Sequence, residues 1–309
     1  MKVALIATVF NEADNLSRWW DCLQRQTVPP DEIVIVDGGS NDGTWEQLQK
    51  LALRSHVPVK LDQRRCNIAA GRNRAIHLTD AEIITANDAG SFPEPTWFGE
   101  ITRPLLEDQT LDVVGGHSET LFENEFQKFS RQFENPLPPP ARAEDVYPSS
   151  RNVAFRRQAW EDVGGYPEWL TLTGEDALFN HGLHKIGKRF FSNPAAVVRW
   201  PVRATADAYF KMLYSYGYGA AEARLYCGNF LRQWAITLFP PLLILSRHRL
   251  GQLKFRYQKN SSSALGWLAG RLKGHRPPKN WRRIEGVFLS PQAQNELRRR
   301  LSETREVVQ

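Results

Sequence analysis

Short apolar runs alternate with amphipathic segments along the first two hundred residues of the chain. The apolar runs predict β-strands near residues 2–9, 32–37, 57–61, 82–87 and 111–115. The segments between them carry apolar residues at helical spacing and predict α-helices near residues 12–26, 43–54, 67–78 and 96–107. This alternation is typical of an α/β fold, in which a mostly parallel sheet has helices on both faces. We therefore predict one large α/β domain over residues 1–205.

Polar side chains follow the first two predicted strands, at the edge where open α/β sheets bind ligands. Thr8, Asn11 and Glu12 lie at the end of the first strand, and Asp37 ends the second. No glycine follows the first strand directly, whereas a dinucleotide-binding dehydrogenase needs the pattern GxGxxG there. The sequence therefore argues against hydride transfer and favours another ligand at these strand ends. Each motif taken alone is also compatible with an ordinary strand–turn–helix unit.

The charge of the chain is unevenly distributed, although its net charge is only +6. Residues 1–230 contain 24 Lys and Arg against 30 Asp and Glu, whereas residues 231–309 contain 16 against 4. A basic C-terminal part on an acidic body favours an anionic partner. This part has no recognisable nucleic-acid motif, so we expect no nucleic-acid partner. Three cysteines without metal-site spacing indicate reduced thiols and a cytoplasmic protein.

The C-terminal part, residues 206–309, is predicted to be helical and contains one long apolar run, residues 234–245. A helix of that length covers about 18 Å, which is short of a bilayer core of roughly 30 Å. Pro240 and Pro241 would also interrupt it. An apolar run flanked by Trp234 and by arginines can instead lie in the membrane interface. We expect peripheral attachment to the inner face of the cell membrane, with a helical part that only packs on the domain as the alternative.

Three further motifs carry chemistry that a ligand site needs. Gly71 and Arg72 stand near a predicted helix start, where a guanidinium can bind a diphosphate. Asp88, in the sequence Asn87-Asp88-Ala89-Gly90, follows the fourth predicted strand and offers a hard oxygen ligand. Gly174-Glu175-Asp176 places two carboxylates at another helix start, and a carboxylate can act as a general base. A surface arginine, a turn residue and helix-dipole acids are the structural alternatives.

Together and in this order, the motifs resemble those of family 2 glycosyltransferases, over about residues 1–205. The resemblance implies a GT-A fold that binds a sugar nucleotide. It implies a nucleotide-binding set consisting of Thr8, Asn11, Glu12, Asp37, Gly71 and Arg72. Within this set, the Asp37 carboxylate would accept a hydrogen bond from the nucleotide base. A UDP-sugar is the expected donor.

The same resemblance predicts a metal site at Asp88. Family members hold a divalent cation, Mg²⁺ or Mn²⁺, against the donor diphosphate through a DxD motif. The spacing to Pro95 and Trp97 aligns Asp88 with the first Asp of that motif, and Gly90 stands at the second position. This Asp-Ala-Gly variant removes one oxygen ligand from the site. We therefore expect a weak metal site that diphosphate oxygens and water complete.

By the same resemblance, Asp176 is the catalytic base of an inverting single displacement, and Glu175 orients the acceptor or the base. Tyr166, Trp169 and Trp200 are candidates for an aromatic wall on which an acceptor sugar packs, and equally for core residues. The predicted reaction transfers a sugar from the nucleotide-sugar donor to a hydroxyl group. The expected acceptor is a glycan or a lipid-linked molecule.

Two other functions stay open. A nucleotidyltransferase shares the α/β sheet, but it needs a Gly- and Lys-rich loop where this chain has Asn11-Glu12-Ala13-Asp14. A non-catalytic sugar-nucleotide-binding protein is compatible with Gly90. The pair Glu175-Asp176 argues against such a protein, because a pure binder has no need of a base.

Overall fold

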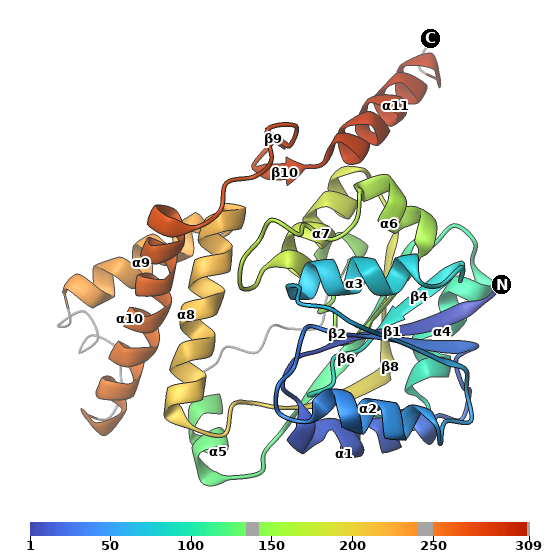
Figure 1. Ribbon diagram of the computed structural model, residues 1–309. Helices are drawn as coiled ribbons and strands as arrows, with labels where there is room; N and C mark the ends of the chain where they lie inside the picture. Colours follow the sequence, from blue (N-terminus) through green and yellow to red (C-terminus); the bar gives the residue numbers. More distant parts are fainter. Residues whose placement is uncertain (134–141, 240–249, 308–309) are drawn as a thin grey trace.

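The computed structural model of the chain describes residues 1–133, 142–239 and 250–307 (Figure 1). Its main body is built on one eight-stranded sheet in the order β3-β2-β1-β4-β7-β6-β8-β5. The strands are β1 (Val3–Val9), β2 (Glu32–Asp37), β3 (Val59–Gln63), β4 (Ile83–Ala86), β5 (Phe92–Pro93), β6 (Val113–Leu121), β7 (Val153–Arg156) and β8 (Phe190–Pro201). Strands β3, β2, β1 and β4 are mutually parallel, and β7 runs antiparallel between β4 and β6. The predicted α/β fold is confirmed.

The elements predicted in the first half of the chain are present, and each begins within two residues of its predicted start. The four helices between the first strands are α1 (Ala13–Gln24), α2 (Thr44–Ala52), α3 (Ile68–His77) and α4 (Trp97–Glu107). Strand β2 is buried along its whole length, which explains its continuous apolar run. Strand β6 continues six residues past its predicted end, because its second half pairs with β8 after a bulge at Gly116 and His117.

Successive side chains of β1 point into two different hydrophobic cores. Leu5 belongs to the core that α1, α2 and α4 cover, together with Trp19 and Leu48. Ile6 belongs to the core on the other face of the sheet, together with Ile76 of α3. Helices α6 (Arg157–Val163) and α7 (Glu175–Lys185) complete this second core. The sheet therefore has helices on both faces, as predicted.

A helical region follows β8 and stands beside the sheet domain, at the left of Figure 1. It contains α8 (Ala206–Ala223), α9 (Cys227–Leu238) and α10 (Leu250–Lys273). Glycines let α8 and α10 approach closely: a Cβ at Gly217 would lie 2.1 Å from the Ser263 carbonyl oxygen. The apolar run predicted over residues 234–245 begins in α9, and its part from Pro240 onward lies outside the described residues. Among the helices that are described, none has the length and apolar character that crossing a membrane requires.

The end of the chain returns to the sheet domain. A hairpin of β9 (Arg282–Ile284) and β10 (Val287–Leu289) leads into α11 (Pro291–Val307). Phe288 lies in the same hydrophobic core as α6 and α7, and the Ser290 hydroxyl donates a 2.6 Å hydrogen bond to the Val163 carbonyl oxygen. Residues 206–309 therefore first form the helical region and then pack on the core of the sheet domain. This packing crosses the domain boundary predicted after residue 205.

Candidate active site

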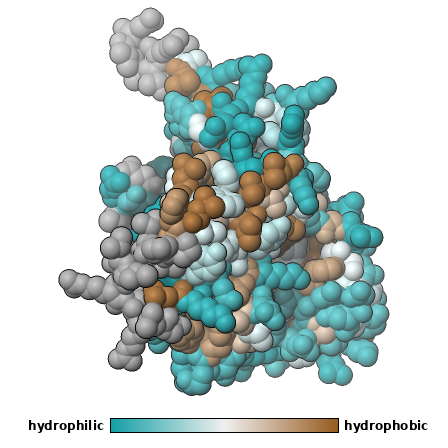
Figure 2. Space-filling view, turned by 90° about the vertical axis from the view of Figure 1, so that its left-hand side faces the viewer, coloured by the Kyte–Doolittle hydropathy of each residue, from teal (hydrophilic) through white to brown (hydrophobic). Residues whose placement is uncertain are grey.

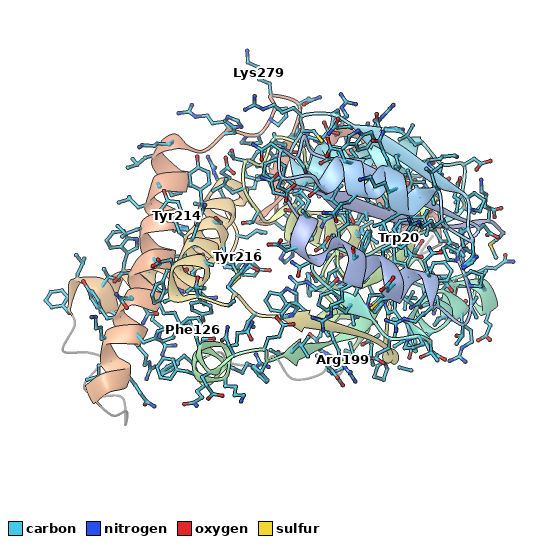
Figure 3. All side chains as sticks on the ribbon, turned by 60° about the horizontal axis from the view of Figure 1, so that its bottom comes forward. Trp20, Phe126, Arg199, Tyr214, Tyr216 and Lys279 are labelled. Atoms are coloured by element: carbon cyan, nitrogen blue, oxygen red, sulfur yellow. The ribbon has the colours of Figure 1, made fainter. Side chains whose placement is uncertain are left out.

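A cavity of about 770 Å³ opens at the carboxyl ends of β1 and β4. Its sheet side includes Thr8, Glu12, Gly71, Asp88 and Gly90. Its lining also includes Arg151, Trp200, Arg203 and Tyr216. Figure 3 shows Tyr216 on the side of α8 that faces the sheet domain, whereas Tyr214 lies on the side that faces α10. The cavity therefore lies between the sheet domain and the helical region.

Three of the predicted nucleotide-binding residues, Thr8, Glu12 and Gly71, line this cavity. Gly71 packs tightly against the end of β1, because a Cβ at this position would lie 2.7 Å from Thr8 Cγ2. The Thr8 hydroxyl is buried, and among the described residues it has no hydrogen-bond partner. A buried hydroxyl without a protein partner is available to a bound ligand.

Asn11 and Asp37 hold the turns beside the cavity and are not among the described residues that line it. Asp37 is fully buried, and its Oδ1 accepts hydrogen bonds from the Ser40 N–H and hydroxyl at 3.0 and 2.6 Å. Its Oδ2 accepts one from the Gln63 amide at 2.8 Å. Asn11 has a φ of 53° and accepts a hydrogen bond from the Asn41 N–H at 3.0 Å. Because Asp37 is fully buried, a nucleotide base can contact it only if the residues that cover it move.

Arg72 is buried between two carboxylates. Its Nη1 donates a hydrogen bond to Glu175 Oε1 at 2.6 Å, and its Nη2 donates one to Asp88 Oδ1 at 2.8 Å. Burial by itself lowers the pKa of Arg72, but the charges of Asp88 and Glu175 outweigh burial and raise it, so the guanidinium stays charged. Arg72 is not among the described residues that line the cavity. It connects the predicted metal residue to the predicted acceptor-side motif.

Glu175 and Asp176 begin α7 directly after Gly174, whose φ of 94° favours glycine. Burial and the neighbouring Asp176 charge raise the pKa of Glu175, against the opposing effect of Arg72. Asp176 is half-buried, and its Oδ1 accepts a 2.7 Å hydrogen bond from the Ala177 N–H. In the described part of the chain it forms no ion pair. Of the two acids, Glu175 is therefore the one paired with Arg72, and the Asp176 carboxylate is left for another partner.

Gly90 faces the Glu12 carboxylate. A Cβ at Gly90 would lie 3.9 Å from both Glu12 Oε1 and Oε2, so Glu12 occupies the space into which a longer side chain would extend. Burial raises the pKa of Glu12, against the opposing effects of the Asn15 hydrogen bond and the Arg203 charge, and the charge of Asp88 adds to the rise. No three His, Cys, Asp or Glu side chains gather as a metal-binding group within the described residues. The protein therefore offers two carboxylates here, those of Glu12 and Asp88.

Of the three aromatic residues predicted as an acceptor wall, Trp200 lines the cavity. Tyr166 is fully buried and stacks on Phe179 with ring centres 4.2 Å apart. Trp169 packs edge-on against Trp281 at 5.9 Å. Tyr166 and Trp169 are therefore core residues, which was the alternative interpretation, and Trp200 remains a candidate for the wall.

Three residues that sequence analysis did not connect with the site also line the cavity: Arg151, Arg203 and Tyr216. The Arg151 guanidinium carbon lies 4.1 Å from the ring centre of Trp200. Arg203 follows the end of β8, and Tyr216 comes from the middle of α8. The one available signal was the position of Arg203 two residues beyond β8, a strand that the sequence analysis does not predict.

The helical region also holds the loop that precedes α7. Glu222 of α8 is buried and accepts hydrogen bonds from the N–H and the hydroxyl of Thr171 at 2.8 and 2.6 Å. It accepts a third from the His275 N–H at 2.7 Å. Because Thr171 and Leu172 line the cavity, α8 contributes to the site both directly and through this loop.

Comparison with known proteins gives relatives that share this fold. The glycosyltransferase AglE of Haloferax volcanii is 26% identical over 178 residues, which are 56% of this chain and 58% of AglE. The succinoglycan biosynthesis protein ExoA of Rhizobium meliloti is 26% identical over 257 residues, which are 78% of this chain and 74% of ExoA. The match to AglE thus spans little more than half of the length of that protein.

A solved structure and a family model agree with these relatives. The mannosyltransferase PcManGT of Pyrobaculum calidifontis, in complex with GDP-Man and Mn²⁺, superposes with a TM-score of 0.57 at 19% identity, covering 87% of this chain and 73% of PcManGT. This similarity shows a shared fold. Residues 4–164, more than half of the chain, match the family model described as glycosyl transferase family 2. The chain therefore belongs to glycosyl transferase family 2.

Proposed function

We propose that the chain is an inverting glycosyltransferase, which transfers a sugar from a nucleotide-sugar donor to a hydroxyl of a glycan or lipid-linked acceptor. The observation that carries this proposal is the double ion pair of Arg72 with Asp88 and Glu175. It joins the predicted donor-side carboxylate to the predicted acceptor-side motif. A single displacement needs both at one site, because the acceptor hydroxyl attacks the sugar while the nucleoside diphosphate leaves.

Asp176 is the general base in this proposal. A sugar hydroxyl is a weak nucleophile, and a carboxylate within hydrogen-bond reach of it can take its proton during attack. Glu175 forms an ion pair with Arg72, whereas Asp176 forms none within the described residues. Both acids lie in the first turn of α7. Glu175 then keeps Arg72 and the start of α7 in place beside the base.

Asp88 and Glu12 would hold the divalent cation, Mg²⁺ or Mn²⁺. Both offer hard oxygen donors on the same side of the cavity, and Mg²⁺ is commonly bound by one or two carboxylates together with substrate phosphates. Because Gly90 has no side chain, the Glu12 carboxylate can occupy the space beside it, 3.9 Å from where a Cβ would lie. When bound, the cation neutralises charge on the departing diphosphate. Arg72 holds Oδ1 of Asp88 and leaves Oδ2 available.

The proposed donor is a UDP-sugar, with Thr8, Glu12 and Gly71 against the nucleotide. The free Thr8 hydroxyl and the close approach of α3 at Gly71 support a ligand at this edge of the sheet. PcManGT contains GDP-Man in its solved structure, so the identity of the nucleotide in the donor has to be tested directly. ExoA is named for succinoglycan biosynthesis, which favours an acceptor from cell-envelope or extracellular polysaccharide assembly.

The helical region is proposed to bind the anionic inner face of the cell membrane peripherally. Leu231, Leu238 and Phe239 of α9 and its C-terminal end have exposed fractions of 64%, 66% and 65%. Figure 2 looks onto the side of the molecule that carries α9 and α10 and shows apolar patches there beside hydrophilic ones. Basic residues of the same helices, such as Arg232 and Arg271, supply attraction to anionic lipid. This location would bring the cavity close to a lipid-linked acceptor.

Two experiments test the proposed function. Thermal unfolding with UDP-, GDP-, dTDP- and CDP-sugars, with and without Mn²⁺, identifies the donor, because a ligand of the folded state raises Tm. Asp176→Asn should then lower sugar transfer by about 10²–10⁴ while donor affinity stays within a few-fold. Asp207→Asn is the matched control, since Asp207 is an exposed acid in the first turn of α8. Full transfer by Asp176→Asn contradicts the assigned base, and donor binding without any transfer favours the non-catalytic alternative.

A further inference from the structure

Two arginines of the cavity wall form no ion pair with an acidic side chain among the described residues. Arg151 and Arg203 both line the cavity, and over residues 1–133, 142–239 and 250–307 neither forms an ion pair. Among the acids that line the cavity, Asp88 and Glu123 are paired with other arginines, whereas Glu12 feels the Arg203 charge but forms no ion pair with it. Guanidinium groups that face a cavity without a direct ion pair attract anionic ligands. This wall therefore presents two guanidinium groups to whatever enters the cavity.

Arg151 is held in position from two sides. Its carbonyl oxygen accepts a 2.7 Å hydrogen bond from the side chain of Asn87, the residue that precedes Asp88. Its guanidinium lies over the Trp200 ring at 4.1 Å. Arg151 Nε is buried and has no hydrogen-bond partner among the described residues. Stacking on an indole leaves the donors in the guanidinium plane available to an anion.

Arg203 has an exposed side chain on a fixed stretch of backbone. The Gln127 amide donates a 2.8 Å hydrogen bond to the carbonyl oxygen of Val202, and the Asn124 amide donates one of 3.0 Å to that of Ala204. Asn124 and Gln127 form the capping box of α5 (Glu125–Arg131), so both are themselves ordered. The backbone is therefore held by hydrogen bonds at the residues directly before and after Arg203.

We propose that Arg151 and Arg203, with the nearby Tyr216 hydroxyl, form a phosphate-binding subsite on this wall. A phosphate group accepts charge-assisted hydrogen bonds from guanidinium groups, often in a bidentate arrangement. Two molecules of the proposed reaction carry phosphate: the donor with its diphosphate and a lipid-linked acceptor. The identity of the ligand rests on the proposed function, whereas the placement of the two arginines does not.

The variants Arg151→Gln and Arg203→Gln in the full chain test the subsite, since glutamine keeps much of the side-chain length and removes the charge. The probes are inorganic pyrophosphate, UDP, uridine and farnesyl phosphate, measured by isothermal titration calorimetry with Mn²⁺. Arg199→Gln is the matched control: Arg199 lies on β8, is exposed and pairs with Glu94 at 3.0 Å (Figure 3). The Tm of each variant checks that it is folded.

We expect both cavity variants to lose about tenfold or more in affinity for pyrophosphate and UDP, with unchanged uridine affinity, if the subsite binds the donor diphosphate. If it binds the acceptor phosphate, the loss falls on farnesyl phosphate and UDP binding is kept. The Arg199→Gln control should match the wild type in every case. Unchanged affinity for all phosphate probes overturns the subsite alone. A wild-type chain that binds none of the phosphate probes overturns the proposed function and the subsite together.

Discussion

Arg72 donates a 2.6 Å hydrogen bond to Glu175, which lies 103 positions further along the chain. The other terminal nitrogen of Arg72 binds Asp88, so one guanidinium joins the end of β4 to the start of α7. The Arg72 side chain is only 3% exposed. A buried cation between two carboxylates is stable only while its partners are present, because removing one leaves an uncompensated charge.

Arg72→Gln should destabilise the protein by about 3–5 kcal/mol, because it leaves the Asp88 and Glu175 carboxylates without their shared cation. Urea unfolding measures this loss. Arg72→Lys keeps the charge but lacks the planar guanidinium group that binds two carboxylates at once. We therefore expect a large decrease in kcat and a smaller decrease in the free energy of unfolding. Arg74→Gln on the same helix is the control, since Arg74 is 40% exposed and pairs with Asp62 near the surface. Equal losses for Arg72→Gln and Arg74→Gln contradict the bridging role.

Glu12→Ala should weaken Mn²⁺ binding in the presence of UDP by on the order of tenfold or more, because it removes one of two carboxylates from the site. Adding Gly90→Asp in the Glu12→Ala background should restore much of that affinity. The open space at residue 90 then receives a carboxylate close to the one that was removed. Electron paramagnetic resonance of free Mn²⁺ measures both effects.

Glu123→Ala is the control for this pair of variants. Glu123 also lines the cavity but is paired with Arg18 at 2.7 Å, so its loss should leave Mn²⁺ affinity unchanged. An identical Mn²⁺ affinity for the wild type and Glu12→Ala would remove Glu12 from the metal site. Asp88 would then be the single protein carboxylate in that site.

Glu222→Gln should loosen the loop before α7, because it replaces a buried carboxylate that accepts three hydrogen bonds. We expect a stability loss of about 1–3 kcal/mol and a larger KM for the acceptor, with donor affinity unchanged. Hydrogen exchange over residues 169–174 should become faster. Unchanged exchange in this loop, together with a normal acceptor KM, would show that Glu222 has only a local structural role.

Leu231→Glu combined with Leu238→Glu should abolish binding to anionic vesicles and leave donor binding intact. The changes place negative charge on the exposed apolar face of α9, beside the basic residues that attract anionic lipid. Wild-type cosedimentation should also fall as salt rises, because salt screens that attraction. Leu53→Glu is the control, since Leu53 is 88% exposed at the end of α2. Equal pelleting of the wild type with neutral and anionic vesicles would contradict an electrostatic contribution to membrane binding.

Glu32 makes the stability of the sheet domain depend on acid pH. Burial by itself raises the pKa of Glu32, but hydrogen bonds from Lys60, Thr79 and Lys2 outweigh burial and lower it. A carboxyl whose pKa is lowered in the folded state stabilises the fold above its unfolded pKa. That stabilisation is lost as the pH falls through the lowered value.

The free energy of unfolding should therefore decrease on acidification below about pH 4.5 in the wild type. Glu32→Gln should have a lower free energy of unfolding than the wild type at pH 7. Its free energy of unfolding should also decrease less on acidification. Urea unfolding between pH 3 and pH 7 measures both quantities. A constant difference between the two proteins over that range would contradict the assignment to Glu32.

The sequence by itself determined the order and type of the elements in the sheet domain, and the strand ends at which polar residues gather. Those features depend on local patterns: apolar runs predict buried strands, and helical spacing predicts the helices between them. The motifs around Thr8, Asp88 and Glu175 were visible for the same reason. The return of β10 to the core was not visible, because a three-residue strand carries no periodicity.

The tertiary structure decided which side chains meet. Arg72 pairs with Glu175, the Glu12 carboxylate lies beside Gly90, and Arg203 lines the same cavity as Asp88. Each of these relationships joins segments that are far apart in the chain and brought together by helices packing on a sheet. Their distances follow from the volumes of the core side chains between them, which no local pattern of hydrophobic and polar residues encodes.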